Sequence, residues 1–237
     1  MEIIRCVSAD EAKKKLAERI SSELVACQED SVPALLLFSG GSALGILDLL
    51  DAKCAGSFLT IAPVDERCDP SGHDSNFGAL VESDFFRRAV STGVGLIDTR
   101  VKSGQGRDAL ADAFGQELAR WRKRHPKGRV IAILGMGPDG HTAGIFPMDD
   151  GREFSRLFEG ERMVVGYRAP EYATCPDRVT VTLSFLCREV ESICVFFSGE
   201  EKRAVWKRVL GNTAPMSALP AIAFHTLSSV EIFTDIG

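Results

Sequence analysis

The sequence predicts an α/β fold built on a mostly parallel β-sheet with helices on both faces. Short apolar runs of strand length alternate with amphipathic helical segments along the chain, and such alternation implies crossover connections between parallel strands. At 237 residues the chain can bury a sizeable core. Because no linker, repeat or low-complexity tract interrupts it, we expect residues 1–237 to form a single domain.

The first helix is expected from the capping sequence Ser8-Ala9-Asp10-Glu11 to about Cys27, since Leu16, Ile20 and Leu24 recur at helical spacing. A polar helix start, with Asp74 or Ser75 as N-cap, is expected before 76–90. The further expected elements are, in chain order, a strand at 32–38, a helix at 43–50, a strand at 58–64, a helix at 76–90, a strand at 94–97, a helix at 108–123, strands at 129–134, 162–168, 178–183 and 191–197, a helix at 200–210 and a strand at 229–234.

Composition restricts the classes of function. The formal net charge of −5 argues against a nucleic-acid-binding surface, although a local basic pocket for a small anion remains compatible with it. The chain shows neither a signal-peptide pattern nor an apolar run long enough for a membrane span. The seven cysteines lack the spacing of a disulfide framework or a zinc site. We therefore expect a soluble, cytoplasmic protein with reduced thiols.

The loop Ser39-Gly40-Gly41-Ser42 follows the apolar strand at 32–38 and precedes a helical pattern. Glycines let backbone N–H groups approach a ligand, and the start of a helix favours an anion. The loop can therefore hold a phosphate, but it can equally be a plain strand-to-helix turn, and the sequence of the loop alone does not decide between them. It matches neither the GxGxxG nor the Walker A pattern.

The strand at 58–64 ends in the charged triplet Asp65-Glu66-Arg67. The acid pair could bind sugar hydroxyls, and the arginine presents a fork of donors that matches phosphate oxygens. Taken alone, the triplet is more typical of an exposed charged turn.

The most informative turn is GMGPDGHTAGIFP at 135–147, which follows the strand at 129–134. It presents Asp139 and His141 two residues apart in a Gly-rich turn. A histidine can take a proton from water, and a neighbouring carboxylate can fix its tautomer and stabilise the imidazolium. Because the three turns follow strands of one parallel sheet, we expect them to open onto the same edge.

The segment GMGPDGHTAGIFP resembles the signature of the 6-phosphogluconolactonases, within the wider glucosamine-6-phosphate isomerase/deaminase superfamily. Supporting matches follow in family order along almost the whole chain: SGGS at 39–42, DER at 65–67, HDSN at 73–76, RVTVTLSFL at 178–186 and SGEEKRAV at 198–205.

The resemblance implies a Rossmann-like fold and hydrolysis of 6-phospho-D-glucono-1,5-lactone to 6-phosphogluconate in the oxidative pentose phosphate pathway, with no metal or cofactor. It implies that His141 is the general base that activates water, with Asp139 as its orienter. The expected partner is a small sugar-phosphate substrate; whether the chain is a monomer or a dimer stays open. The residues expected to bind substrate or phosphate are Ser39, Gly40, Gly41, Ser42, Asp65, Arg67, Arg178 and Lys202.

Two alternatives are weighed against this interpretation. Deaminases of the superfamily typically carry a glutamate shortly after the DGH turn, as in DGHIAFNEP, whereas here Phe146 precedes Pro147 and no acid follows His141 before that proline. A non-catalytic sugar-phosphate-binding module would keep SGGS but lose Asp139 and His141, and both are present. The sequence therefore favours the lactonase.

Several positions depart from the usual family pattern, among them the segment SFLCREVESI after RVTVTL, where the family usually places proline. Ala43-Leu44 follow SGGS, whereas relatives typically read SGGST-P or SGGRTP, so a hydroxyl and a helix-starting proline are missing and we expect the phosphate loop to rely more on its backbone. Gly144 stands where serine is usual, so we expect a looser local helix after His141.

Overall fold

A seven-stranded parallel sheet forms the centre of the molecule in the computed structural model, which describes residues 1–237 apart from the side chain of Ala52. Strand order is β1-β10-β9-β6-β2-β3-β5. The strands are β1 (Glu2–Arg5), β2 (Ala34–Phe38), β3 (Leu59–Pro63), β5 (Gly95–Leu96), β6 (Arg129–Gly135), β9 (Ser192–Phe196) and β10 (Val230–Thr234). The predicted mostly parallel sheet is confirmed.

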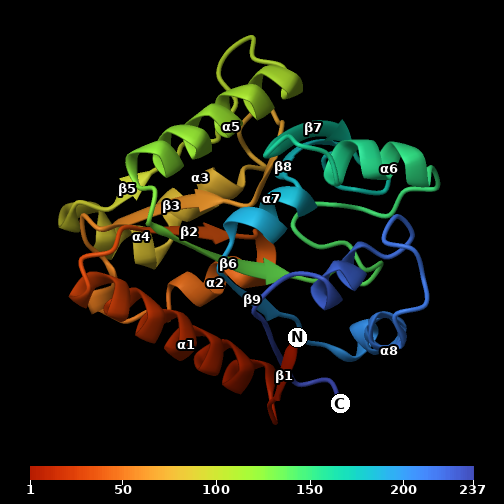
Figure 1. Cartoon of the computed structure of the whole chain (residues 1–237), viewed down its shortest axis with the longest axis horizontal. Helices are drawn as coiled ribbons and strands as arrows, with labels where there is room; N and C mark the ends of the chain where they lie inside the picture. The colour runs from red at the N-terminus through yellow and green to blue at the C-terminus, as the bar shows by residue number, and fades with distance from the viewer.

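Helices cover both faces of this sheet, as predicted (Figure 1). Strand β2 is buried along its whole length, and its alternate residues face opposite ways, Leu35 and Leu37 into one core and Leu36 and Phe38 into the other. Helices α1, α2, α3 and α4 pack into the second of these cores, and α5, α7 and α8 pack into the first. Their bounds are α1 (Ala9–Glu29), α2 (Leu44–Leu47), α3 (Asn76–Glu82), α4 (Asp84–Ala89), α5 (Arg107–Arg124), α6 (Gly151–Phe158), α7 (Leu183–Glu189) and α8 (Arg203–Gly211).

The order of the strands reverses between β2 and β6. From β2 the chain moves outward to β3 and β5, then returns to the other side of β2 and continues through β6, β9 and β10. Parallel sheets bind ligands beyond the carboxyl ends of their strands at such a reversal. The loops after β2 and β6 are the Ser39–Ser42 loop and the Asp139–His141 turn, so the topology places both at this point.

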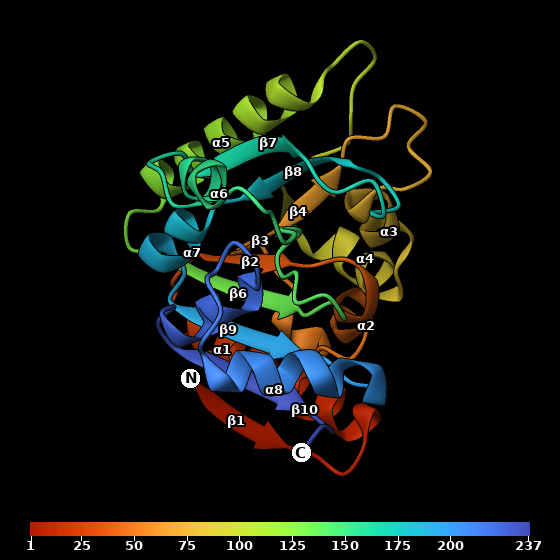
Figure 2. The ribbon, with the colours of Figure 1, turned by 90° about the vertical axis from the view of Figure 1, so that its right-hand side faces the viewer.

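A second sheet lies beside the first, and the sequence did not suggest it. It is three-stranded and antiparallel, in the order β4 (Asp65–Arg67), β8 (Asp177–Val181), β7 (Val164–Arg168). Figure 2 shows these strands beneath α5 and apart from β6, β9 and β10. The expectation of a turn at 65–67 was wrong, because the chain leaves β3 at Val64 and at once pairs with β8. An apolar run indicates a strand but not its pairing direction.

Several element boundaries also differ from the predictions. The helix expected at 76–90 breaks at Ser83, whose hydroxyl caps α4, and the helix expected at 43–50 is only a 3₁₀ turn (Gly41–Ala43) followed by the single turn of α2. Strand β1 and helices α6 and α7 were not predicted. The remaining 3₁₀ turns are Ala52–Cys54, Val90–Thr92, Glu200–Lys202 and Pro220–His225. Within the described residues, no helix combines the length and the apolar character needed to cross a membrane.

Glu66 joins β4 to its surroundings from inside the protein. Its carboxylate is fully buried and accepts five hydrogen bonds. The donors are the backbone N–H groups of Arg67, Asn76 and Phe77 and the hydroxyls of Ser75 and Thr99. Burial raises the pKa of this carboxyl, and the donors oppose the rise. One side chain thereby connects β4, the start of α3 and the segment that follows β5.

We expect Glu66→Ala to lower the free energy of unfolding by at least about 3 kcal/mol, since it leaves several buried donors without an acceptor. Denaturant unfolding followed by far-UV circular dichroism measures the change. Glu82→Ala is the matched control, because Glu82 is exposed on α3 and its truncation should change stability by less than about 0.5 kcal/mol. Equal stability of the two variants would contradict this role of Glu66.

Candidate active site

A cleft of about 660 Å³ opens at the carboxyl ends of β2 and β6, where the strand order reverses. The second sheet forms another of its walls. All ten residues that the sequence singled out line this one cleft, which gives them a common location and leaves their roles as predictions. They are Ser39, Gly40, Gly41, Ser42, Asp65, Arg67, Asp139, His141, Arg178 and Lys202.

Asp139 and His141 form a hydrogen-bonded pair in the turn after β6. The imidazole Nδ1 lies 2.6 Å from Asp139 Oδ1, and the backbone N–H of His141 donates to the same oxygen at 3.1 Å. A carboxylate can only accept, so Nδ1 carries the proton and Nε2 of the neutral ring is free to act as a base. The ring of Phe146 stacks on the imidazole with centroids 4.3 Å apart, which fixes its plane.

The Asp139 carboxylate is also bound on its other oxygen. The Tyr172 hydroxyl donates to Oδ2 at 3.0 Å. Burial alone would raise the pKa of Asp139, but the hydrogen bonds from His141 and Tyr172 and the charge of the imidazolium lower it to about 2. Asp139 is therefore a carboxylate at neutral pH, and it can stabilise a protonated His141.

The turn after His141 is a tight reverse turn, so the expected local helix is wrong. Thr142 and Ile145 form an antiparallel bridge, and Ala143 and Gly144 between them have φ of +50° and +66°. Positive φ at both central residues is the pattern of a type I′ turn. A Cβ at Gly144 would lie 2.5 Å from the Asp65 carboxylate, so glycine at this position lets β4 approach the turn after His141.

Two side chains of the second sheet hold this turn in place. The Tyr167 hydroxyl donates to the Gly144 carbonyl and accepts from the Phe146 N–H, and the Thr180 hydroxyl donates to the Ala143 carbonyl. The second sheet thus fixes the position of Phe146 and, through the stacked rings, that of His141.

The Ser39–Ser42 loop follows β2 and lines the same cleft as the Asp139–His141 turn. The Ser39 hydroxyl is buried and has no hydrogen-bond partner among the described residues, so it is available to a ligand. The helix after the loop is too short to contribute a strong dipole. Ala43 is fully buried in the core and does not line the cleft, so its methyl group packs inward.

Gly40 allows a close approach between this loop and Asn76. A Cβ at Gly40 would lie 2.0 Å from Asn76 Oδ1, closer than any side chain tolerates. Asn76 is buried and donates to the Asp65 carbonyl at 2.7 Å, so it connects the Ser39–Ser42 loop to β4.

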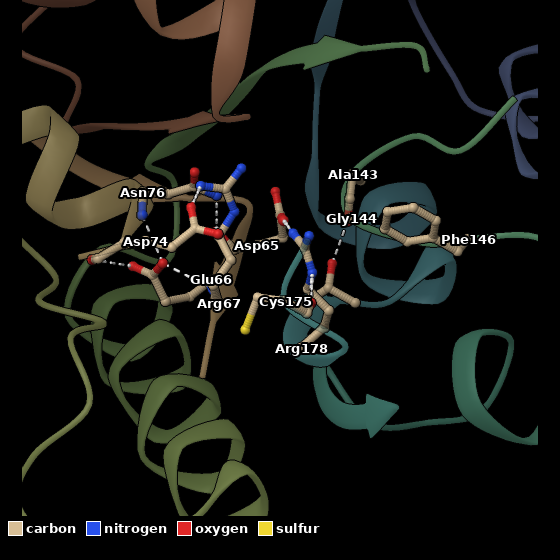
Figure 3. A network of polar contacts seen from close by, with 12 residues as sticks. Asp65, Glu66, Arg67, Asp74, Asn76, Ala143, Gly144, Phe146, Cys175 and Arg178 are labelled. Atoms are coloured by element: carbon tan, nitrogen blue, oxygen red, sulfur yellow. Dashed lines mark hydrogen bonds and ion pairs between the residues drawn. The ribbon is translucent and has the colours of Figure 1, made fainter. Parts of the chain in front are cut away.

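Strand β4 presents alternate residues to opposite sides. Asp65 and Arg67 line the cleft, whereas Glu66 points away from it toward Asn76, as Figure 3 shows. Of the acid pair in the sequence, only Asp65 is therefore placed to meet a ligand. Arg67 forms an ion pair with Asp74, and its Nε is buried without a partner in the described part of the chain.

Arg178 faces Asp65 across the paired strands β4 and β8 (Figure 3). Both side chains are almost fully buried, with 3.4 Å between Nη1 and Oδ2. The Arg178 Nε donates to the Cys175 carbonyl at 2.7 Å, and the guanidinium lies 5.4 Å from the centre of the Phe146 ring. Arg178 is therefore held rigidly, with donors left over at the cleft.

Lys202 also lines the cleft, from the 3₁₀ turn before α8. Burial lowers the pKa of its ammonium, while Glu201 and Asp235 oppose the change. No ion pair within 4.0 Å joins this amine to an acid in the described part of the chain. Of the three cations that line the cleft, Lys202 thus differs from Arg67 and Arg178, which are both paired with aspartates.

The described residues contain no group of three or more His, Cys, Asp or Glu side chains arranged to hold a metal ion. The seven cysteines are free thiols in the structure. Cys194 is buried, and burial raises its pKa to about 12.

Comparison with known proteins shows the family to which the chain belongs. The family model described as glucosamine-6-phosphate isomerases/6-phosphogluconolactonase matches residues 7–231. This chain belongs to that family. The 6-phosphogluconolactonase of Helicobacter pylori is 29% identical over 94% of this chain and 93% of its own length, and that of Rattus norvegicus is 30% identical over 90% and 82%. The crystal structure of a 6-phosphogluconolactonase from Shewanella baltica, 22% identical, has the same fold, with a TM-score of 0.79 over 99% of this chain and 97% of that one.

Sequence reasoning missed three side chains that shape the site of this family member. Asn76 could have been found, because it ends the HDSN match and stands at a helix start. The inward direction of Glu66 follows from strand alternation once 65–67 is known to be a strand. Tyr172 lies in the loop between β7 and β8 and carries no signal in the sequence that points to the cleft.

We expect Gly40→Ala to reduce kcat/KM by at least about tenfold, because the new methyl group must displace Asn76 and with it the Ser39–Ser42 loop. Steady-state kinetics measure the loss. Gly45→Ala is the matched control, since a Cβ there meets nothing within 4 Å and lies outside the cleft. If both variants keep wild-type kinetics, the contact between Gly40 and Asn76 does not shape the binding site.

Proposed function

We propose that this chain hydrolyses 6-phospho-D-glucono-1,5-lactone to 6-phospho-D-gluconate, with His141 as the general base. The observation that carries the proposal is the Asp139–His141 pair, with Nε2 free, in a cleft that also presents three cationic side chains. Relatives that match most of this chain are named 6-phosphogluconolactonase. The pair supplies a base, and the cations suit a phosphorylated substrate.

The proposed reaction needs a water, a base and a proton donor. Nε2 of neutral His141 takes a proton as the water oxygen attacks the lactone carbonyl carbon, and the negative charge moves to the carbonyl oxygen. When the tetrahedral intermediate collapses, the bond from the carbonyl carbon to the ring oxygen breaks. His141 returns its proton to that oxygen, which becomes the C5 hydroxyl. The product acid ionises and releases one proton to solvent.

The charges of the cleft suggest where the phosphate binds. Arg67 and Arg178 each have an aspartate partner, so their charges are largely balanced before substrate enters. By comparison, no acid forms an ion pair with the Lys202 amine in the described part of the chain, and the amine is partly buried. We therefore assign Lys202 the leading electrostatic role toward the phosphate. The Ser39 hydroxyl, the Gly40 and Gly41 backbone and Ser42 complete the proposed cradle, with Arg67 and Arg178 as further donors to substrate. Asp65 is the proposed contact to the sugar ring.

The deaminase alternative is less well supported. Deamination with ring opening needs a second proton-handling acid beside the histidine. At the corresponding place Phe146 stacks on His141, and the segment from Thr142 to Phe146 carries no acid. A non-catalytic sugar-phosphate-binding module is also disfavoured, because Asp139 and His141 are hydrogen-bonded in the way that a general base and its orienting carboxylate require.

The proposal extends to the setting of the reaction. We propose that residues 1–237 act as a single domain, in the cytoplasm and as a monomer or a dimer, on a free small-molecule substrate. The single domain is supported by the family match over residues 7–231 and by one apolar core shared by β2 of the first sheet and by β7 and β8 of the second.

We expect His141→Ala to reduce kcat for the lactone at least a hundredfold while the fold stays intact, because general-base catalysis contributes about 10²–10⁴-fold. Proton release from freshly generated lactone measures turnover, and circular dichroism checks the fold. His125→Ala is the control, since His125 ends α5 and is not among the residues that line the cleft. Near-normal turnover by His141→Ala rules out the assigned base.

We expect Lys202→Ala to weaken discrimination between 6-phosphogluconolactone and unphosphorylated gluconolactone. The loss of kcat/KM should be at least about tenfold larger for the phosphorylated substrate than for the unphosphorylated one. Kinetics with both substrates measure the ratio. Lys207→Ala, which removes an exposed lysine of α8, should leave the ratio unchanged. An equal loss on both substrates would show that Lys202 does not hold the phosphate.

A further inference from the structure

Tyr172 reaches from the second sheet to the catalytic turn. It lies in the loop that joins β7 to β8, and its hydroxyl donates to Asp139 Oδ2 at 3.0 Å. Its ring meets Phe146 edge-on, with centroids 6.1 Å apart, and Phe146 in turn stacks on His141. Tyr172 is 65% exposed, so packing into the core does not explain its position.

The two oxygens of Asp139 have different partners. Oδ1 accepts both hydrogen bonds from His141, which belongs to the same turn. Oδ2 accepts from Tyr172, which approaches from a separate sheet. A carboxylate held on one oxygen can still rotate out of the imidazole plane, whereas a donor on the second oxygen fixes its orientation.

The same loop also holds the arginine side of the cleft. Three residues after Tyr172, the Cys175 carbonyl accepts the Nε–H of Arg178 at 2.7 Å. Loop residues 169–176 therefore contact the orienter of the base through Tyr172 and a candidate substrate-binding cation through Cys175. The loop therefore connects the proposed base to Arg178 through these two hydrogen bonds.

Tyr172 stays a donor throughout the working pH range. Although the residue as a whole is 65% exposed, partial desolvation of its hydroxyl, the hydrogen bond to Asp139 and the charge of that carboxylate raise the pKa of the hydroxyl to about 12. A neutral donor on Oδ2 takes up part of the carboxylate charge, which would otherwise act entirely on His141.

We propose that Tyr172 is a positioning residue for the catalytic base: its hydroxyl fixes the Asp139 carboxylate and limits how strongly that carboxylate holds a proton on His141. This inference rests on the proposed lactonase function. Tyr172 does not itself exchange a proton with the substrate; it acts through Asp139.

The test compares Tyr172→Phe with the wild type in the pH dependence of kcat/KM for the lactone. Phenylalanine keeps the ring edge against Phe146 and removes only the donor. We expect kcat to fall by about tenfold with KM changed less than twofold, since a hydrogen bond to a charged group is lost.

We also expect the acid limb of the profile to move to higher pH, because an unshared Asp139 charge holds the His141 proton more tightly. The other charged groups that line the cleft with this turn are unaltered in the variant: Asp65 of β4, Arg67 of β4, Arg178 of β8 and Lys202 before α8.

A double-mutant cycle makes the test specific. If Tyr172 acts through Asp139, then Tyr172→Phe should change kcat by less than about twofold when Asp139 is already asparagine. An additive loss in the double variant, or a Tyr172→Phe profile that superimposes on that of the wild type, overturns the inference. Absence of lactone hydrolysis by the wild type itself would instead contradict the proposed function, so the two failures are distinguishable.

Discussion

The cleft depends on one buried carboxylate that does not itself line it. The Glu66 carboxylate accepts five hydrogen bonds from donors in β4, at the start of α3 and in the segment after β5. Strand alternation then turns its neighbours Asp65 and Arg67 outward into the cleft. Because Asn76 is fixed by the same carboxylate and also meets Gly40, the position of the Ser39–Ser42 loop follows from it as well. A buried charge is costly unless its hydrogen bonds are complete, and here both oxygens are used.

The proposed chemistry divides between the two sheets. The parallel sheet supplies the Ser39–Ser42 loop and the Asp139–His141 turn at the reversal of strand order, which is where this class of sheet binds ligands. The antiparallel sheet supplies Arg178 and the hydroxyls that hold the catalytic turn. Since His141 is fixed by Asp139 on one side and by the Phe146 ring on its face, the proposed base is preorganised before substrate enters.

Sequence patterns predicted the parallel sheet and most of its helices, because buried strands leave strong local signals. The ten residues expected at the site are among those that line the cleft, but Arg178 and Lys202 were expected only from the family resemblance. The second sheet could not be predicted in this way: β4 is three residues long and charged, and its pairing with β8 is a long-range contact. For the same reason the inward direction of Glu66 and the contact of Tyr172 with Asp139 emerged only from the structure. The prediction of a helix after His141 was wrong because Ala143 and Gly144 have positive φ and reverse the chain direction at once.

The central claim is that this cleft hydrolyses a phosphorylated sugar lactone. The most direct measurement follows proton release from 6-phosphogluconolactone generated in place, with and without the protein, and assays ammonia release from glucosamine 6-phosphate in parallel. Our account predicts that the protein accelerates proton release well above the spontaneous rate and releases no ammonia. Proton release at the spontaneous rate, or ammonia release from the amino sugar, would contradict it.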